Sequence, residues 1–162
     1  MVDNQIVDQL LIKPTSDLPK LSRYLYKNLR NTLPPLMSNY KKYYTIPAPP
    51  DEVYLALTNP LSIKLWSGAD VEMSTEPGSE FSLFNGDVLG KNIEFEENKK
   101  IVQQWYFDGQ EEPSIVTIKL HEHAKGASVE LLHTNIPDES YDEFVEGWNT
   151  SYFGELLEFF ED

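Results

Sequence analysis

Large apolar residues near the end of the chain recur at intervals of three and four positions. The recurrence runs from Ser140 to Asp162 and includes Tyr141, Phe144, Val145, Trp148, Tyr152, Leu156 and Phe160. Because residues three and four apart share one face of an α-helix, this spacing predicts a long helix with a broad apolar face. Such a large aromatic surface must be buried against another element, and we expect the helix to lie on the concave face of an antiparallel sheet.

The residues before this helix form short apolar runs that end at turn residues. The runs predict seven strands, at residues 41–46, 70–74, 80–84, 88–96, 101–107, 114–122 and 127–135. Asn85-Gly86 is a typical hairpin sequence. After the first strand, residues 52–58 and 61–66 predict two short helices, with Asp51 as the cap of the first. The prediction is an α+β fold, in which a curved antiparallel sheet of about six or seven strands wraps around a long C-terminal helix.

The charge divides the chain into a basic head and an acidic body. Residues 1–42 hold seven Lys or Arg and three Asp. Residues 43–162 hold six Lys or Arg and twenty-four Asp or Glu. We expect a basic, partly helical N-terminal extension at residues 1–37 and a domain at residues 38–162. Leucine and basic residues at helical spacing between 18 and 30 predict an amphipathic helix in the extension. It could dock on a partner or an acidic membrane, although packing on its own domain or a free tail is commoner.

Composition narrows the classes of function. The chain has 13 Lys and Arg against 27 Asp and Glu, a formal net charge of −14, which disfavours nucleic acid and anionic lipid as partners. It has no Cys, which excludes disulfides, thiol nucleophiles and thiolate metal sites and makes the cytoplasm the default compartment. The first thirty residues contain no long apolar run, so we expect neither a secretory signal nor a membrane span.

Four motifs accompany this order of elements. They are residues 47–54 at a strand-to-helix turn, residues 58–66 ending in Trp66, the glycine-containing hairpin region 78–105, and Gly147-Trp148. Over residues 38–162 the chain resembles the helix-grip fold of the SRPBCC superfamily, which includes START and birch-pollen-allergen-like proteins. Within it, the chain resembles the family of homologues of the heat-shock-90 ATPase activator. Residues 97–100 depart from that family, in which a proline-containing turn is common.

The resemblance implies a fold more than a function. Some members of the family stimulate a chaperone ATPase, others bind apolar ligands, and many have no assigned role, so fold alone cannot choose among them. Residues 1–36 have no counterpart in that domain.

Strand parity predicts which residues would line a cavity between the sheet and the helix, because alternate residues of a strand face opposite sides. The expected cavity residues are Phe81, Leu83, Ile93, Trp105, Ile118, Leu131 and His133 from the sheet, and Trp148 and Tyr152 from the helix. Tyr106 and Leu132 are expected to point outward. His133 could bind a ligand or act as an acid or base, although a core histidine satisfied by a neighbour is the commoner role.

No metal or cofactor site is predicted. His121 and His123 share one face of a strand, as a metal pair would, but they are expected on the outer face without a third ligand. The sequence contains neither a glycine-rich phosphate loop nor a cluster of metal ligands.

Two functional hypotheses lead. The first is a noncatalytic binding domain that holds a small hydrophobic or amphipathic molecule between the sheet and the C-terminal helix. The second is a chaperone-associated protein that acts through its charged surface, for which the acidic closing helix could recognise a basic partner. An enzyme ranks third, because only His133, with Tyr152 or Gln103, is placed to supply convergent polar groups. The sequence does not specify the ligand, the partner or the oligomeric state.

Overall fold

The computed structural model describes residues 37–161. Within them, six strands form one antiparallel sheet in the order β1-β6-β5-β4-β3-β2. The strands are β1 (Met37–Ile46), β2 (Glu80–Leu83), β3 (Val88–Glu96), β4 (Lys100–Trp105), β5 (Ser114–His123) and β6 (Gly126–Pro137). The amphipathic helix expected between residues 18 and 30, like the rest of the extension before Met37, lies outside the described residues.

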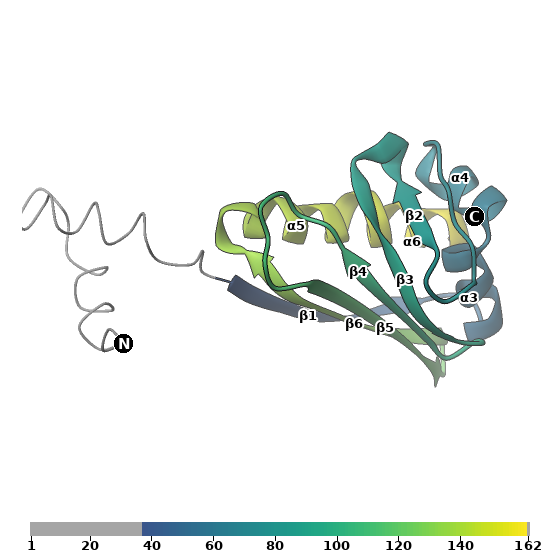
Figure 1. The fold of residues 1–162 in the computed structure, drawn as a ribbon. Helices are drawn as coiled ribbons and strands as arrows, with labels where there is room; N and C mark the ends of the chain where they lie inside the picture. Colours follow the sequence, from purple (N-terminus) through teal and green to yellow (C-terminus); the bar gives the residue numbers. More distant parts are fainter. Residues whose placement is uncertain (1–36, 162) are drawn as a thin grey trace, which may run out of the picture. The chain divides into compact units, whose positions relative to one another are not determined.

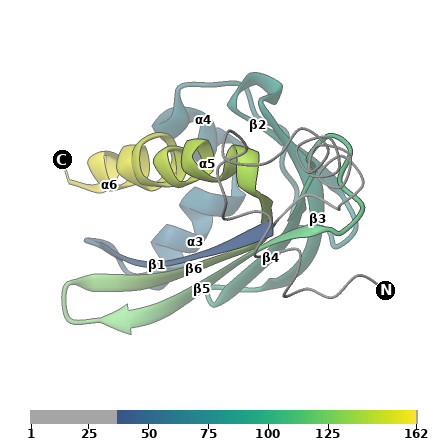
Figure 2. The same ribbon diagram turned by 90° about the vertical axis from the view of Figure 1, so that its left-hand side faces the viewer.

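The helices cover one face of the sheet, as Figure 1 shows. Two short helices, α3 (Pro50–Thr58) and α4 (Pro60–Ser67), follow β1, and α5 (Tyr141–Gly147) and α6 (Phe153–Phe160) close the chain. Figure 2 shows the sheet curving around α5 and α6, with β1, β6 and β5 below them and β3 and β2 to one side. Helix α3 contacts β5 and β6, while α4 contacts α6. This arrangement confirms the predicted fold class.

The strand expected at residues 70–74 is wrong. Only Glu72 pairs there, in an isolated bridge with Ser82. The carbonyl oxygen of Ser74 instead accepts a hydrogen bond from the Asn92 side chain at 3.0 Å. The segment is therefore a loop tied to the sheet by side chains, and the sheet has six strands in the described residues rather than seven.

The cap predicted for the first short helix is wrong, and the second short helix has a side-chain cap. Asp51 does not cap α3, because the helix begins one residue earlier at Pro50, whose missing N–H is not needed in a first turn. Asp51 lies in that first turn, where its charge suits the helix dipole. Asn59 caps α4, since its Oδ1 accepts a hydrogen bond from the backbone N–H of Ser62 at 3.1 Å.

The closing helix is interrupted, whereas the sequence predicted one continuous helix. Residues Trp148–Tyr152 form a π-helical turn between α5 and α6. The wider turn carries the backbone N–H of Phe153 to the carbonyl of Trp148, five residues back. As a result, the adjacent residues Tyr152 and Phe153 are both buried, which a regular α-helix lying on a surface does not readily allow.

Asn149 holds this turn against the sheet. Its Nδ2 donates to the hydroxyl of Tyr40 at 3.0 Å and to the carbonyl of Val145 at 2.8 Å. Its Oδ1 accepts from the hydroxyl of Tyr44 at 2.9 Å and from the ammonium of Lys42. One amide thus joins β1 to the closing helix at the point where the helix widens.

Candidate functional site

A pocket of about 450 Å³ lies between the β2–β3 hairpin, the end of β4 and the closing helix. It is open to solvent at a polar rim and apolar at its floor. Its lining residues are Phe84, Asp87, Val88, Trp105, Glu143, Phe144, Glu146, Gly147, Trp148, Thr150, Ser151 and Tyr152. The helix residues of this lining come from α5 and from the π-helical turn, so the turn forms part of one wall.

Two stacked indoles form part of the floor. The ring centroids of Trp105 and Trp148 are 4.7 Å apart, and the ring planes differ by 27°. Each indole N–H is held by a buried side chain: Trp105 donates to Oε1 of Gln103 and Trp148 donates to Nδ1 of His133, both at 3.0 Å. Stacking and the two hydrogen bonds preorganise this surface before any ligand arrives.

His133 is completely buried beneath the indoles, and its hydrogen bonds assign its tautomer. Because an indole N–H can only donate, Nδ1 is the acceptor and the proton of the neutral ring is on Nε2. Nε2 lies 2.6 Å from Oγ of Ser114, and the hydroxyl of Ser114 donates to the carbonyl oxygen of Thr134 at 3.1 Å. Burial lowers the pKa of His133 from 6.5 to about 3.

This geometry limits what His133 can do. A general base must accept a proton from its partner, but Nε2 of His133 donates to Ser114 and Nδ1 is occupied by Trp148. Ser114 was not anticipated from the sequence, since it lies at the start of β5, nineteen residues from His133 along the chain. The pair therefore orients the indole of Trp148 and does not form an activated nucleophile.

A second buried network supports Trp105. Nε2 of Gln103 donates to Oδ1 of Asn92 at 3.0 Å. Nδ2 of Asn92 donates in turn to the carbonyl of Ser74 at 3.0 Å and to Oγ of Ser79 at 3.2 Å. The orientation of Trp105 in the pocket is thus connected to the loop before β2.

Most of the residues expected to line the cavity are buried, as strand parity and the spacing of the closing helix predicted. The buried ones are Phe81, Leu83, Trp105, Ile118, Leu131, His133, Trp148 and Tyr152. Only Trp105, Trp148 and Tyr152 of this set line the pocket, whereas the others pack in the core beneath and beside it. Tyr106 is exposed, as expected, and Leu132 is half-buried.

Ile93 is a correction to the expected set. Its side chain is 41% exposed and does not face the helix. The pairing of β3 with β4 shifts register between Asn92 and Glu94, and this bulge reverses the alternation of faces in β3. Asn92 takes the buried position instead and joins the network of Gln103.

Several pocket residues were missed. Phe144 belongs to the apolar spacing of the closing helix, so the sequence contained a signal for it. Phe84 and Asp87 lie in the turn after β2, where parity does not apply. Phe84 has a left-handed φ of 53°, which is strained for a bulky side chain, and its ring contacts those of Trp66 and Tyr152. The sequence pattern carries no signal for that conformation.

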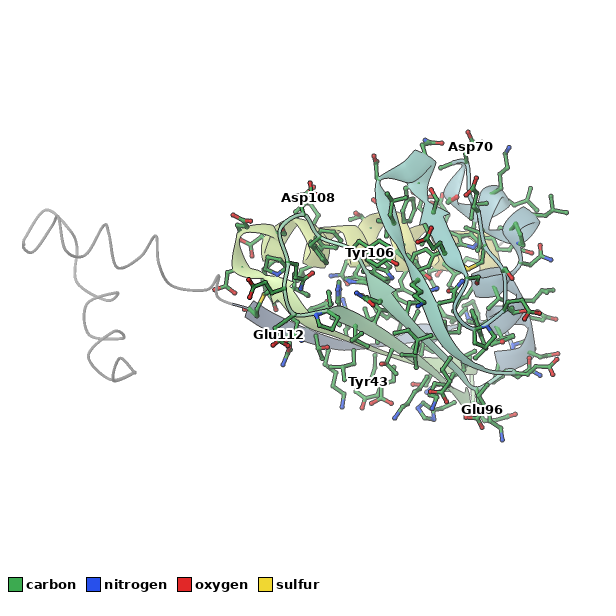
Figure 3. The ribbon with its side chains drawn as sticks, in the orientation of Figure 1. Tyr43, Asp70, Glu96, Tyr106, Asp108 and Glu112 are labelled. Atoms are coloured by element: carbon green, nitrogen blue, oxygen red, sulfur yellow. The ribbon has the colours of Figure 1, made fainter. Side chains whose placement is uncertain are left out.

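His121 is paired on the outer face of the sheet. Its Nε2 lies 3.3 Å from one carboxylate oxygen of Glu130, and the other oxygen lies 3.3 Å from Nζ of Lys41. The hydrogen bond to His121 is the main reason that the pKa of Glu130 is lowered. Tyr43 projects from the same outer face, as Figure 3 shows. This cluster lies on the side of the sheet away from the pocket.

A curved antiparallel sheet wrapped around a closing helix, with two short helices after its first strand, defines this protein as a helix-grip domain of the SRPBCC superfamily. The sequence profile of the family described as "Activator of Hsp90 ATPase homolog 1-like protein" matches residues 47–161. The chain belongs to this family. The resemblance inferred from the four motifs is therefore confirmed.

Known relatives agree with this assignment. An "Activator of 90 kDa heat shock protein ATPase homolog" from Dictyostelium discoideum is 30% identical over 102 residues, which cover 61% of this chain and 27% of that protein. A human protein described as "Activator of 90 kDa heat shock protein ATPase homolog 1" is 26% identical over 106 residues, which cover 64% of this chain and 31% of that protein. The chain spans less than a third of the length of the curated relatives it matches.

A solved structure shows the same fold. The crystal structure of an HSP90 activator from Plasmodium falciparum superposes with a TM-score of 0.68 at 24% identity, covering 75% of this chain and 94% of that one. Within the described residues, no helix is both long and apolar enough to cross a membrane.

Proposed function

We propose that the domain binds a small hydrophobic or amphipathic molecule in the pocket between the sheet and the closing helix. The observation that carries this proposal is the stacked pair Trp105 and Trp148, whose indole nitrogens are held by Gln103 and His133. A volume of about 450 Å³ suits a small ligand. A floor held in place by buried hydrogen bonds lowers the entropic cost of binding.

The proposed role is noncatalytic. Of the polar groups that the sequence placed near the cavity, His133 and Gln103 are occupied by hydrogen bonds that orient the two indoles. Binding and orientation are what these groups can supply, because neither presents a free donor or acceptor to the pocket. The cytoplasm remains the proposed default compartment, since a chain without cysteine needs no oxidising environment for disulfides.

The test combines a ligand panel with a variant that fills the pocket. Gly147 lies at the pocket wall in a helical conformation, and a Cβ there would meet nothing within 4 Å. Gly147→Leu therefore places a side chain in the pocket without straining the backbone. Amide chemical shifts are measured while fatty acids, sterols and flavonoids are added. We expect shifts at Trp105, Trp148 and Tyr152 that disappear in Gly147→Leu; shifts confined to the outer face would overturn the proposal.

A second candidate function is association with a heat-shock-90 chaperone. It is favoured by the family match and by the names of the relatives from Dictyostelium discoideum and human. The acidic exterior would then meet a basic chaperone surface, and the association would weaken as salt increases. The test measures the ATPase rate of 90 kDa heat shock protein with and without this chain. Stimulation that survives Gly147→Leu would support this role, and no stimulation at low salt would exclude it.

A further inference from the structure

The pocket has a negatively charged rim above an aromatic floor. Asp87 lies on the side of the β2–β3 hairpin, and Glu143 and Glu146 lie on α5. All three are exposed, and the described residues that line the pocket include no Lys, Arg or His. Within the described part of the chain, none of the three carboxylates takes part in an ion pair. The rim therefore presents negative charge that no neighbouring cation offsets within residues 37–161.

The charge continues into an adjoining hollow. This second space, of about 420 Å³, shares Asp87 and Phe144 with the pocket and adds the carboxylates of Asp108 and Glu139. Asp108 stands in the loop between β4 and β5, beside the start of the closing helix (Figure 3). The negative potential at the mouth of the pocket thus comes from the hairpin, the loop and the helix together.

The floor suits a cation as well as an apolar group. The rings of Trp105, Trp148 and Phe144 pack together there, with ring centroids 4.7 Å apart for the two indoles and 6.1 Å apart for Trp105 and Phe144. Aromatic faces attract organic cations through the ring quadrupole, and tryptophan does so best. An anionic ligand would find neither a cationic partner nor a favourable potential among these groups.

Tyr152 supplies a polar group inside the pocket. Its side chain is only 5% exposed, and burial raises its pKa, so the phenol stays neutral. Among the described residues its hydroxyl has no hydrogen-bond partner. Every fully enclosed side-chain polar atom of these residues does have a partner, so the hydroxyl of Tyr152 is not fully enclosed. The hydroxyl therefore keeps contact with the open space that its ring lines. A buried, unpartnered hydroxyl oxygen in a pocket is an acceptor for an N–H donor of a ligand.

From the aromatic floor, and from a Tyr152 hydroxyl and rim carboxylates that have no partner among residues 37–161, we infer that the pocket selects an organic cation, namely an amine with an apolar or aromatic body. The body lies on Trp105 and Trp148, and the ammonium group lies toward the rim within reach of carboxylates. This inference rests on the proposed binding function and adds the charge of the ligand to it. The net charge of −14 further favours the approach of a cation from solution.

The test uses three probes with one aromatic body and different charge. They are 2-(1-naphthyl)ethylamine, 2-(1-naphthyl)ethanol and 1-naphthylacetate, titrated by calorimetry into the full chain at 0.15 M salt. We expect the amine to bind about tenfold more tightly than the alcohol, through cation–π and rim contacts, and the carboxylate to bind most weakly.

Two triple variants separate local charge from overall charge. The rim variant carries Asp87→Asn, Glu143→Gln and Glu146→Gln, and we expect the preference for the amine to fall to about threefold or less while the alcohol binds as before. The control variant carries Glu122→Gln, Glu155→Gln and Glu158→Gln, which remove the same charge from exposed positions outside the pocket lining. It should retain the full preference.

Each outcome has a separate meaning. If the alcohol binds as tightly as the amine, and Gly147→Leu abolishes both, the charge inference is overturned while the pocket function stands. If no probe binds the unaltered chain, the pocket function fails and the inference with it. If the control variant loses the preference as fully as the rim variant, the selectivity arises from overall charge and the assignment to the rim is overturned.

Discussion

The indole nitrogen of Trp148 donates a hydrogen bond to Nδ1 of His133 at 3.0 Å, inside the core and directly beneath the pocket. The contact joins the closing helix to β6, the strand beside β1 in the sheet. It also requires a neutral imidazole, because a protonated Nδ1 could not accept the indole proton. The position of the pocket floor is therefore linked to the protonation state of one buried histidine.

The first prediction concerns pH. Burial lowers the pKa of His133 to about 3, whereas the ordinary value is 6.5. Between these values the unfolded chain binds a proton that the folded protein does not, so the free energy of unfolding falls as the pH falls from 6.5 toward 3. The slope from this group is at most about 1.4 kcal/mol per pH unit. Urea unfolding between pH 7 and pH 4 measures it.

The control for this prediction is His133→Gln, which removes the titrating ring but not the surrounding carboxylates. Its unfolding free energy should fall less steeply over the same range than that of the unaltered protein. Imidazole proton resonances provide a direct readout, and those of His133 should not shift between pH 8 and pH 5. A His133 resonance that titrates near pH 6 would contradict the buried, neutral assignment.

The second prediction concerns Gln103. Gln103→Met keeps the volume of the side chain but leaves the indole N–H of Trp105 and Oδ1 of Asn92 without partners. Each unsatisfied buried group costs about 1–3 kcal/mol, so the two together should lower the unfolding free energy by about 2–6 kcal/mol. Gln104→Met, one residue along on the other face of β4, should change it by about 0.5 kcal/mol or less. Equal effects would show that the network contributes nothing specific.

The third prediction compares two glycines. A Cβ at Gly90 would overlap the carbonyl oxygen of Gln104 and lie 2.5 Å from Cζ of Phe81, whereas a Cβ at Gly147 would meet nothing. Gly90→Ala should lower the unfolding free energy by about 1–3 kcal/mol through overpacking. Gly147→Ala should raise it by about 0.5–1 kcal/mol, since glycine is a poor residue within a helix. Thermal unfolding of the two variants shows whether each is less or more stable than the unaltered protein. A stabilised Gly90→Ala would refute the close approach of Gly90 to Gln104 and Phe81.

The fourth prediction concerns Asn149. Asn149→Ala removes the amide that joins Tyr40, Tyr44 and Lys42 to the π-helical turn. We expect a loss of about 1–2 kcal/mol in unfolding free energy, because the half-buried hydroxyls of Tyr40 and Tyr44 lose their partner. Thr150→Ala is the matched control, since its hydroxyl makes one exposed bond to the carbonyl of Glu146. If the two variants unfold alike, the turn is held by packing rather than by Asn149.

The fold could be predicted from the sequence because the residue patterns that indicate its helices and strands are local. Apolar spacing from Tyr141 to Phe160 predicted the closing helix, and Asn85-Gly86 predicted the hairpin between β2 and β3. Strand alternation assigned Trp105 and His133 to the buried face, since neighbouring residues of a regular strand must face opposite sides. These features depend on spacing alone and need no knowledge of a distant partner.

Alternation failed where pairing became irregular. Phe95 packs against the core while Ile93, two residues before it, is exposed, because the bulge after Asn92 breaks the alternation between them. Register is set by the contact of β3 with β4 and not by β3 alone. The π-helical turn at Trp148 likewise occurs where Asn149 bonds to Tyr40 and Tyr44 of β1, more than a hundred residues away along the chain. The π-helical turn contributes Trp148, Thr150, Ser151 and Tyr152 to the lining of the pocket.

The sequence by itself determined the order of the elements, the family and the buried faces of the regular strands, because these follow from local periodicity and motif. Only the tertiary structure decided the tautomer of His133, its hydrogen bond to Ser114 and the union of Asp87 with Glu143 at one rim. Those properties arise from groups brought together across the fold, where hydrogen-bond direction, burial and potential depend on distance in space. Distance along the chain carries no information about them.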